Sequence, residues 1–252
     1  MRTFFSPQQI IKRSCLGLIE QAGVYLKPAS HHMPEARFFI FGQGRSGTTL
    51  LQDLFNSYPD IQCDGEILYN PVFCPYDYVE RRCRLSTNKV YGFKVKNYQL
   101  AGMQRIRKPK DFLTRLSQLG WKIVFIKREN FFRHAISFPY IVARKKTGKK
   151  QVVLDPEEIF RQMRIRRYYG HEEDKAARGL PVHRIVYERD LLDPAQHQPT
   201  MDRAFAFLGL DAVSVQTTYR RKTRDDLSAL ILNYDQLRQR IQGTEFEEYL
   251  DE

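Results

Sequence analysis

The feature that most constrains the fold lies between Phe38 and Leu51, where an apolar run leads into a glycine-rich turn and then into a segment typical of a helix. Glycines at 42, 44 and 47 let the backbone of the turn curl closely around a bound group. The first N–H groups of a helix have no partner within that helix, and successive amides of such a turn form a concave nest. The sequence therefore predicts a strand, an anion-binding loop and a helix, in that order.

The loop departs from a Walker A loop at one position. Gly42 and Gly47 have the Walker spacing, but Thr48 stands where the Walker lysine belongs, and the basic residue is Arg45, inside the turn. Because the Walker lysine contacts the β- and γ-phosphates of ATP, its absence argues against hydrolysis of ATP or GTP. A basic residue in the turn still suits a short 5′ anion that has no triphosphate tail.

The segment from Gly44 to Thr49, with Asn56 to Asp60 after it, resembles the 5′-phosphosulfate loop of sulfotransferases that use PAPS, 3′-phosphoadenosine 5′-phosphosulfate. The pattern is most similar to the branch that contains tyrosylprotein sulfotransferases and many bacterial sulfotransferases. In that branch a Cys-Gly-Glu element follows the loop, and here Cys63 to Glu66 matches it with one extra residue. The resemblance extends from about residue 37 to residue 222 and implies PAPS as the donor and PAP as the product.

The resemblance assigns the donor's two ends to separate groups of residues. It places the 5′ group on Gly44, Arg45, Ser46, Gly47, Thr48 and Thr49, and the 3′-phosphate on Arg128, Ser137, Arg221 and Lys222. An arginine is suited to this position because its planar fork of donors matches phosphate oxygens.

The register of the 3′-phosphate site stays open. Arg128 and Ser137 are nine residues apart, one more than in the cytosolic branch, and Glu129 occupies the shorter register, where it would repel a phosphate. Arg133 and Lys127 are the alternatives to Arg128. Tyr187 and Glu188 match a Tyr-Glu element that supports the fold more than the chemistry.

The catalytic residues follow from the same resemblance. An acceptor hydroxyl that attacks sulfur must lose its proton to a general base within hydrogen-bond reach. Glu66 is the candidate base and Asp64 the alternative, because the extra residue leaves the alignment ambiguous. Arg45 and Lys94 are the candidates that stabilise the transferring sulfonate. We expect no metal, because the sequence holds no cluster with ligand spacing.

The order of apolar and amphipathic segments predicts an α/β fold of the P-loop NTPase type, with a central parallel sheet and helices on both faces. We expect an N-terminal helical arm over 1–36 and one sulfotransferase domain over 37–252. The expected strands are 37–41, 90–95, 121–126 and 182–187. The expected helices are 48–56, 111–119, 131–145, 156–177, 201–208 and 227–241, with a helical turn at 76–82.

Composition bears on partners and location. Lys and Arg exceed Asp and Glu by 41 to 29, a net charge of +12, which favours an anionic partner and suggests a glycan or an acidic peptide as acceptor. A helix over 10–26 packs on the domain or lies on a membrane surface, and it has too many charges for a span. We expect a cytoplasmic protein, with peripheral membrane contact as the alternative.

Two other functions compete with sulfonate transfer. A P-loop nucleotide kinase would need magnesium, ATP and a lysine at position 48, where this chain has threonine. A polyanion- or RNA-binding protein would use the basic runs at 81–84, 145–150 and 161–167. We expect no nucleic-acid partner, because no recognition module is visible and aromatic residues do not alternate with the basic ones.

Overall fold

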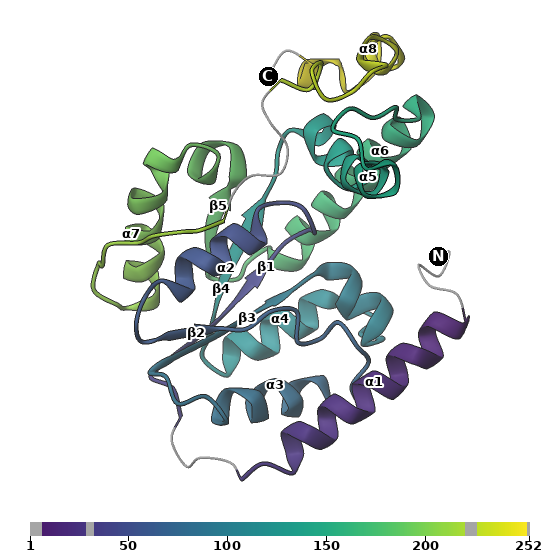
Figure 1. Cartoon of the computed structure of the whole chain (residues 1–252). Helices are drawn as coiled ribbons and strands as arrows, with labels where there is room; N and C mark the ends of the chain where they lie inside the picture. The colour runs from purple at the N-terminus through teal and green to yellow at the C-terminus, as the bar shows by residue number, and fades with distance from the viewer. Residues whose placement is uncertain (1–6, 29–32, 220–225, 251–252) are drawn as a thin grey trace.

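The computed structural model describes residues 7–28, 33–219 and 226–250 of the chain. At its centre lies a sheet of five parallel strands in the order β2-β3-β1-β4-β5, with helices on both faces (Figure 1). The strands are β1 (Ala36–Phe41), β2 (Ile61–Cys63), β3 (Val90–Val95), β4 (Trp121–Lys127) and β5 (Val182–Val186). The predicted α/β fold with a central parallel sheet is confirmed.

β1 occupies the middle of the sheet because its side chains are apolar in both directions. Phe38 and Ile40 face one helical layer, Phe39 and Phe41 face the other, and all four are fully buried. The chain places β2 and β3 on one side of β1 and then crosses to β4 and β5 on the other. The carboxyl end of β1 is therefore the switch point at which open α/β sheets bind their ligands.

Two helical layers enclose the sheet. One face is covered by α3 and α4, against an aromatic core that includes Phe93 and Trp121. The opposite face is covered by α2 and α7, whose apolar sides meet Phe38 and Ile185. The bounds of these helices are α2 Thr48–Asn56, α3 Pro75–Arg84, α4 Pro109–Gln118 and α7 His197–Leu208.

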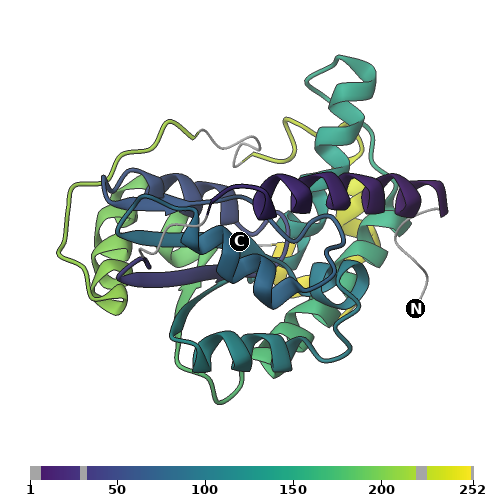
Figure 2. The same ribbon diagram turned by 90° about the horizontal axis from the view of Figure 1, so that it is seen from below.

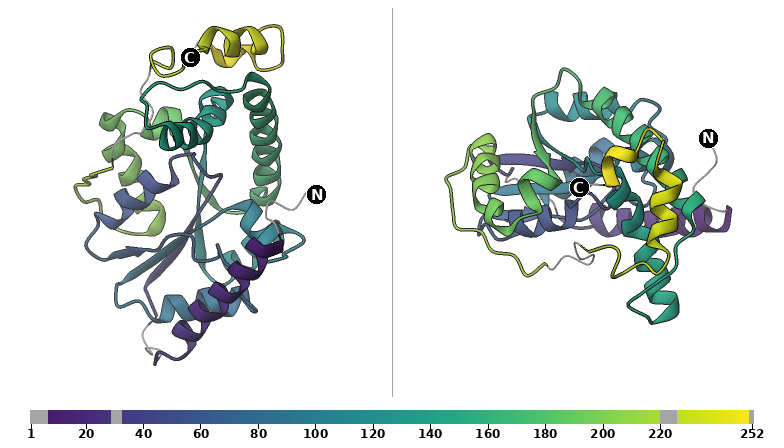
Figure 3. Two further views of the ribbon diagram at one scale, coloured as in Figure 1. Left: turned by 45° about the vertical axis from the view of Figure 1, so that its right-hand side comes forward. Right: turned by 90° about the horizontal axis from the view of Figure 1, so that it is seen from above.

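A third group of helices stands beyond the carboxyl ends of the strands and packs around its own apolar cluster, which includes Phe132, Met163 and Leu237 (Figure 3). The long helix α6 runs from this cluster back along the sheet, because Ala176 and Ala177 near its end belong to the core of the α4 face. The elements are α5 Phe131–Thr147, α6 Pro156–Ala177, α8 Tyr234–Ile241 and the 3₁₀ turn η4 Glu247–Leu250.

Three elements differ from the sequence prediction. The helix expected over 227–241 begins only at Tyr234, because the backbone before it pairs with Val152 through N–H···O bonds from Val152 to Leu230 and from Leu232 to Val152. Strand β2 escapes prediction because it has only three residues. Helix α7 begins earlier than expected, after the π-helical turn η2 (Tyr187–Leu191) and the 3₁₀ turn η3 (Pro194–Gln196).

Helix α1 (Pro7–Tyr25) lies along the outside of α3 and contacts the domain through a narrow stripe (Figure 2). Gly17 fits directly against the backbone of Pro71, and the side chain of Gln21 accepts a hydrogen bond from the N–H of Phe73 at 2.9 Å. Other apolar side chains of this helix face outward, Ile19 being 69% exposed. In the ranges that the structure describes, no helix combines the length and the apolar character needed to cross a membrane.

The two glycines of α1 give a matched test of this packing. A Cβ atom at Gly17 would lie 2.1 Å from the carbonyl oxygen of Pro71, whereas a Cβ at Gly23 meets nothing within 4 Å. We expect Gly17→Ala to destabilise the protein by about 1–3 kcal/mol through overpacking. Gly23→Ala should stabilise it by up to about 1 kcal/mol, because alanine is the better helix former. Urea midpoints of the two variants should therefore move in opposite directions, and equal shifts would contradict the packing described.

Candidate functional site

The loop between β1 and α2 is fixed by close contacts on two sides. A Cβ atom at Gly42 would lie 2.3 Å from the carbonyl oxygen of Ile126 in β4, and one at Gly47 would lie 2.5 Å from the ring of Tyr187. Gly47 has a φ of 93° and Arg45 a φ of 70°, so the turn uses left-handed backbone at two positions. Arginine rarely adopts this conformation, and such backbone is often found at functional sites.

The loop leads into α2 without a side-chain cap. Gly47 is the N-cap residue and offers no side chain, so no side-chain hydrogen bond caps the first turn of the helix. The hydroxyl of the buried Ser46 donates back to the carbonyl of Gln43 at 2.7 Å, and Thr48 is also buried. Thr49 is exposed, and its hydroxyl oxygen lies 3.5 Å from Nζ of Lys94. The groups of this turn that could meet an anion are therefore the backbone amides at the start of α2.

On one side of the loop the structure brings Arg45, Arg128 and Ser137 together. The guanidinium of Arg45 donates from Nε to the Ser137 hydroxyl at 3.0 Å, and Nη1 of Arg128 donates to the carbonyl of Arg45 at 3.2 Å. These three residues line one cavity of about 140 Å³, together with the start of α2 and Tyr187. Two guanidinium groups and a hydroxyl group thus line a small cavity beside the uncapped start of α2.

The Tyr-Glu element after β5 holds Arg128 in this position. The Arg128 guanidinium lies over the ring of Tyr187 at 4.9 Å, and its Nε is 3.5 Å from the carboxylate of Glu188. The same carboxylate accepts the N–H groups of Glu129 and Asn130 at 2.9 and 3.2 Å. The sequence pattern indicates only a fold element here, whereas the structure gives these residues a positioning role.

The candidate residues at the end of β4 differ in burial. The Arg128 side chain is only 8% exposed and contacts the loop, whereas Glu129 is exposed. Lys127, one of the alternatives, instead pairs with Asp174 at 2.8 Å. Arg221 and Lys222 lie outside the described residues.

On the other side of the loop stand Glu66, Lys94 and Lys96. The Glu66 carboxylate accepts from Nζ of Lys96 and from the amide of Gln99, both at 2.6 Å. Nζ of Lys96 lies 3.4 Å from the position of a Cβ atom at Gly44, so this ion pair touches the loop. Lys94 is 6% exposed, and burial lowers the pKa of its ammonium group, against the opposing charge of Glu66.

Asp64, the alternative base, is held elsewhere. Its carboxylate accepts from Arg82 at 2.6 Å, from the Tyr91 hydroxyl at 2.8 Å and from Gln62 at 3.1 Å. These donors come from α3 and from the strands, not from the loop. Of the two carboxylates, Glu66 is the one whose contacts lead to the loop.

Three residues that contact the loop are absent from the sequence prediction: Lys96, His134 and Arg166. The His134 ring is fully buried, and burial, with the charges of Arg166 and Arg128, holds its pKa well below the usual value. The neutral ring donates from Nε2 to the carbonyl of Gly44 at 2.8 Å. Lys96 is two residues after Lys94, so strand periodicity predicts that both lysines lie on the same face. No sequence pattern marks His134 or Arg166.

Similarity to known proteins was found at the level of structure. No protein-family model matches the chain, and no curated protein matches it. Mouse sulfotransferase SULT7A1 complexed with PAP is similar with a TM-score of 0.51 and 14% sequence identity, over 100% of this chain and 96% of that one. A sulfotransferase from Alicyclobacillus acidocaldarius has a TM-score of 0.47 and 17% identity, over 87% of this chain and 96% of that one. The chain therefore has the sulfotransferase fold.

A buried carboxyl group, that of Glu173, contacts the loop through Gln43. Glu173 of α6 is 2% exposed, and burial raises its pKa to about 8, although a hydrogen bond from Gln43 and the charge of Lys127 oppose the shift. A carboxyl with a higher pKa in the folded state binds its proton more tightly when folded. The stability that it contributes is therefore present at low pH and is lost as pH rises from about 4.5 to about 8.

The substitution Glu173→Gln removes this titration. We expect the wild type to lose up to about 1.4 kcal/mol of unfolding free energy per pH unit between pH 6 and pH 8. Its melting temperature should fall over the same range. That of Glu173→Gln should fall less. The neighbouring Glu172→Gln changes a carboxylate that pairs with Lys175 on the surface, and should follow the wild type. Parallel pH profiles for all three proteins would refute the assignment.

Proposed function

We propose that this protein transfers a sulfonate group from PAPS to a hydroxyl group of an acceptor. One observation carries the proposal: Arg45, Arg128 and Ser137 face a common cavity beside the uncapped start of α2. A ligand with one anionic group at the start of α2 and a second near the two arginines would suit this arrangement. The sulfotransferase fold of the chain supports this choice of ligand, and one of its structural neighbours is complexed with PAP.

In this proposal, two sets of residues bind the two ends of the donor. The amides from Gly44 to Thr49 would hold the 5′ end of the donor, and Arg45, Arg128 and Ser137 would hold its 3′-phosphate. PAPS, when bound, supplies the sulfonate group and leaves as PAP. Tyr187 and Glu188 keep Arg128 turned toward the cavity, and His134 fixes the carbonyl of Gly44, so the loop is preorganised before any ligand enters.

We assign the chemical roles to Glu66 and Lys94, on the other side of the loop. Glu66 would accept the proton of the acceptor hydroxyl, and its contacts with Lys96 and Gln99 fix the orientation of its carboxylate. The ammonium group of Lys94, buried beside Thr49, would stabilise negative charge that develops on the transferring group. Arg45 points toward Ser137, so we assign it chiefly to the 3′-phosphate.

The rival kinase function has less support. Thr48 replaces the Walker lysine and is itself 5% exposed, so its side chain is largely withdrawn into the fold. The two lysines near the loop, Lys94 and Lys96, come from β3 and its end instead, and Lys96 is engaged by Glu66. A triphosphate therefore lacks its usual cationic partner.

Donor binding is tested first by thermal unfolding with PAP, with ATP and magnesium as the control ligand. A ligand at about 100 times its dissociation constant adds about 2.7 kcal/mol of stability. We expect PAP to raise the melting temperature of the wild type, and Arg45→Ala to abolish most of the shift. A shift with ATP and magnesium but none with PAP would overturn the proposal in favour of the kinase.

The two carboxylates are separated by a second measurement, the release of PAP from PAPS with a mixed panel of alcohols and phenols. We expect Glu66→Gln to lower kcat by about 100-fold or more while the melting shift with PAP persists, because only the base is lost. Asp64→Asn should lower stability, since Arg82 and Tyr91 lose their partner, but retain kcat within about tenfold. The reverse pattern would make Asp64 the base.

A further inference from the structure

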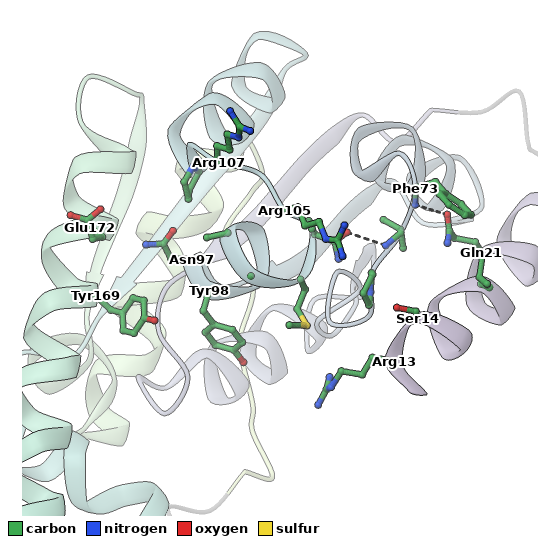
Figure 4. Close-up of a pocket in the computed structure, with 18 of the residues that line it drawn as sticks. Arg13, Ser14, Gln21, Phe73, Asn97, Tyr98, Arg105, Arg107, Tyr169 and Glu172 are labelled. Atoms are coloured by element: carbon green, nitrogen blue, oxygen red, sulfur yellow. Dashed lines mark hydrogen bonds between the residues drawn. The ribbon is translucent and has the colours of Figure 1, made fainter. Parts of the chain in front are cut away.

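A cavity of about 730 Å³ lies beside the site and is walled by four parts of the chain (Figure 4). Helix α1 contributes Leu18 and Gln21, and the segment 71–73 contributes Phe73. The third wall is the π-helical turn η1 (Gln99–Met103) with the residues around it, and the fourth is α6 with Tyr168 and Tyr169. Its size is that of a site for a small organic molecule.

The wall of the cavity contacts the residues that hold the candidate base. Tyr98 lines it, and the hydroxyl of Tyr98 lies 3.5 Å from Nζ of Lys96, the lysine that pairs with Glu66 at 2.6 Å. Gln99, the next residue, donates to the other oxygen of Glu66. The turn that forms one wall of the cavity is thus the same turn that orients the Glu66 carboxylate.

One buried polar atom of the cavity has no partner. Asn97 is 6% exposed and lines the cavity, and its Oδ1 atom is buried without a hydrogen bond to any residue that the structure describes. A buried acceptor without a donor is costly, so Asn97 marks a polar end of the cavity that favours a hydrogen-bonding group on a ligand. Figure 4 shows Asn97 near Tyr98 and Tyr169, away from Gln21 and Phe73.

The rest of the lining combines apolar and cationic residues with a few polar ones and one carboxylate, Glu172, which pairs with Lys175. Leu18, Phe73 and Tyr168 line the cavity and are also 48%, 81% and 57% exposed, so apolar surface continues outward from it. Arg105 and Arg107 also line it, and neither has an ion-pair partner among the described residues. Arg105 adopts a φ of 54°, a backbone conformation rarely seen outside glycine and asparagine.

We infer that this cavity binds the acceptor, and that the acceptor is a small anionic amphiphile: an apolar body with a hydroxyl at the Asn97 and Tyr98 end and an acidic group near Arg105 and Arg107. The inference rests on the proposed function, because it takes Glu66 as the base. It makes α1 the outer wall of the acceptor site, held in place by Gly17 and Gln21. A polar glycan would leave the apolar lining unmatched.

The test compares three acceptors of defined chemistry by the rate of PAP release from PAPS. These are 10-hydroxydecanoate, the uncharged 1,10-decanediol and the polar N,N′-diacetylchitobiose. We expect kcat/KM to decrease in that order, with a loss of about fivefold on removal of the charge. Preference for the chitobiose, or equal rates for all three, would overturn the inference.

Paired variants test the two halves of the lining. Leu18→Gln should raise KM for 10-hydroxydecanoate about tenfold, whereas Ile19→Gln, an exposed neighbour outside the cavity, should not. Arg107→Gln should raise KM for the acid but not for the diol. Lys110 is nearby but does not line the cavity, so Lys110→Gln should change the KM of neither acceptor. Equal effects within either pair would argue against the cavity as the acceptor site.

The melting shift with PAP separates the two levels of failure. A PAP shift retained in every variant, with no preference among the acceptors, would overturn the acceptor inference alone. The loss of any PAP shift in the wild type would overturn the proposed function and the inference with it.

Discussion

The close fit of one loop between two neighbours fixes the geometry of the whole site. Gly42 touches the backbone of β4 and Gly47 touches Tyr187, so neither position has room for a side chain. The loop is also held from within, by the His134 and Arg166 side chains that donate to the Gly44 carbonyl. A backbone constrained at both ends and in its middle loses little further entropy when it closes on an anion.

The basic groups around this loop come from distant parts of the chain, and the sheet brings them together. Arg128 stands at the end of β4, Lys94 near the end of β3, and Arg45 follows β1. These three strands are adjacent and parallel, so their carboxyl ends meet at one edge. Lys94 and His134 are buried, so the interior of the site is poorly solvated, and this burial lowers the pKa values of both groups. Charges act more strongly in such surroundings than in water.

Much of this arrangement is legible in the sequence, for reasons that differ by element. The strand at 37–41 and the helix at 48–56 are predicted because continuous apolar runs and glycine spacing are local signals. Arg128 and Ser137 are found by similarity to a family motif, and the burial of Arg128 against the loop favours it over the exposed Glu129. Strand β2 is too short to leave a signal, and the role of Glu188 depends on two backbone N–H groups 59 and 58 positions away. His134 and Glu173 carry no local mark, since their importance comes from burial that only the tertiary fold creates.

Helix α1 has two kinds of position: residues that attach it to the domain and residues that line the cavity. The helix meets the domain through a few residues, among them Gly17, Gln21 and Val24, while others such as Leu18 line the adjacent cavity. Substitutions at the second kind of position leave the glycine-rich loop and the sheet untouched. A lineage carrying this fold can therefore change one surface helix, and with it the shape and chemistry of the adjacent cavity, while the sheet and its loop stay constant.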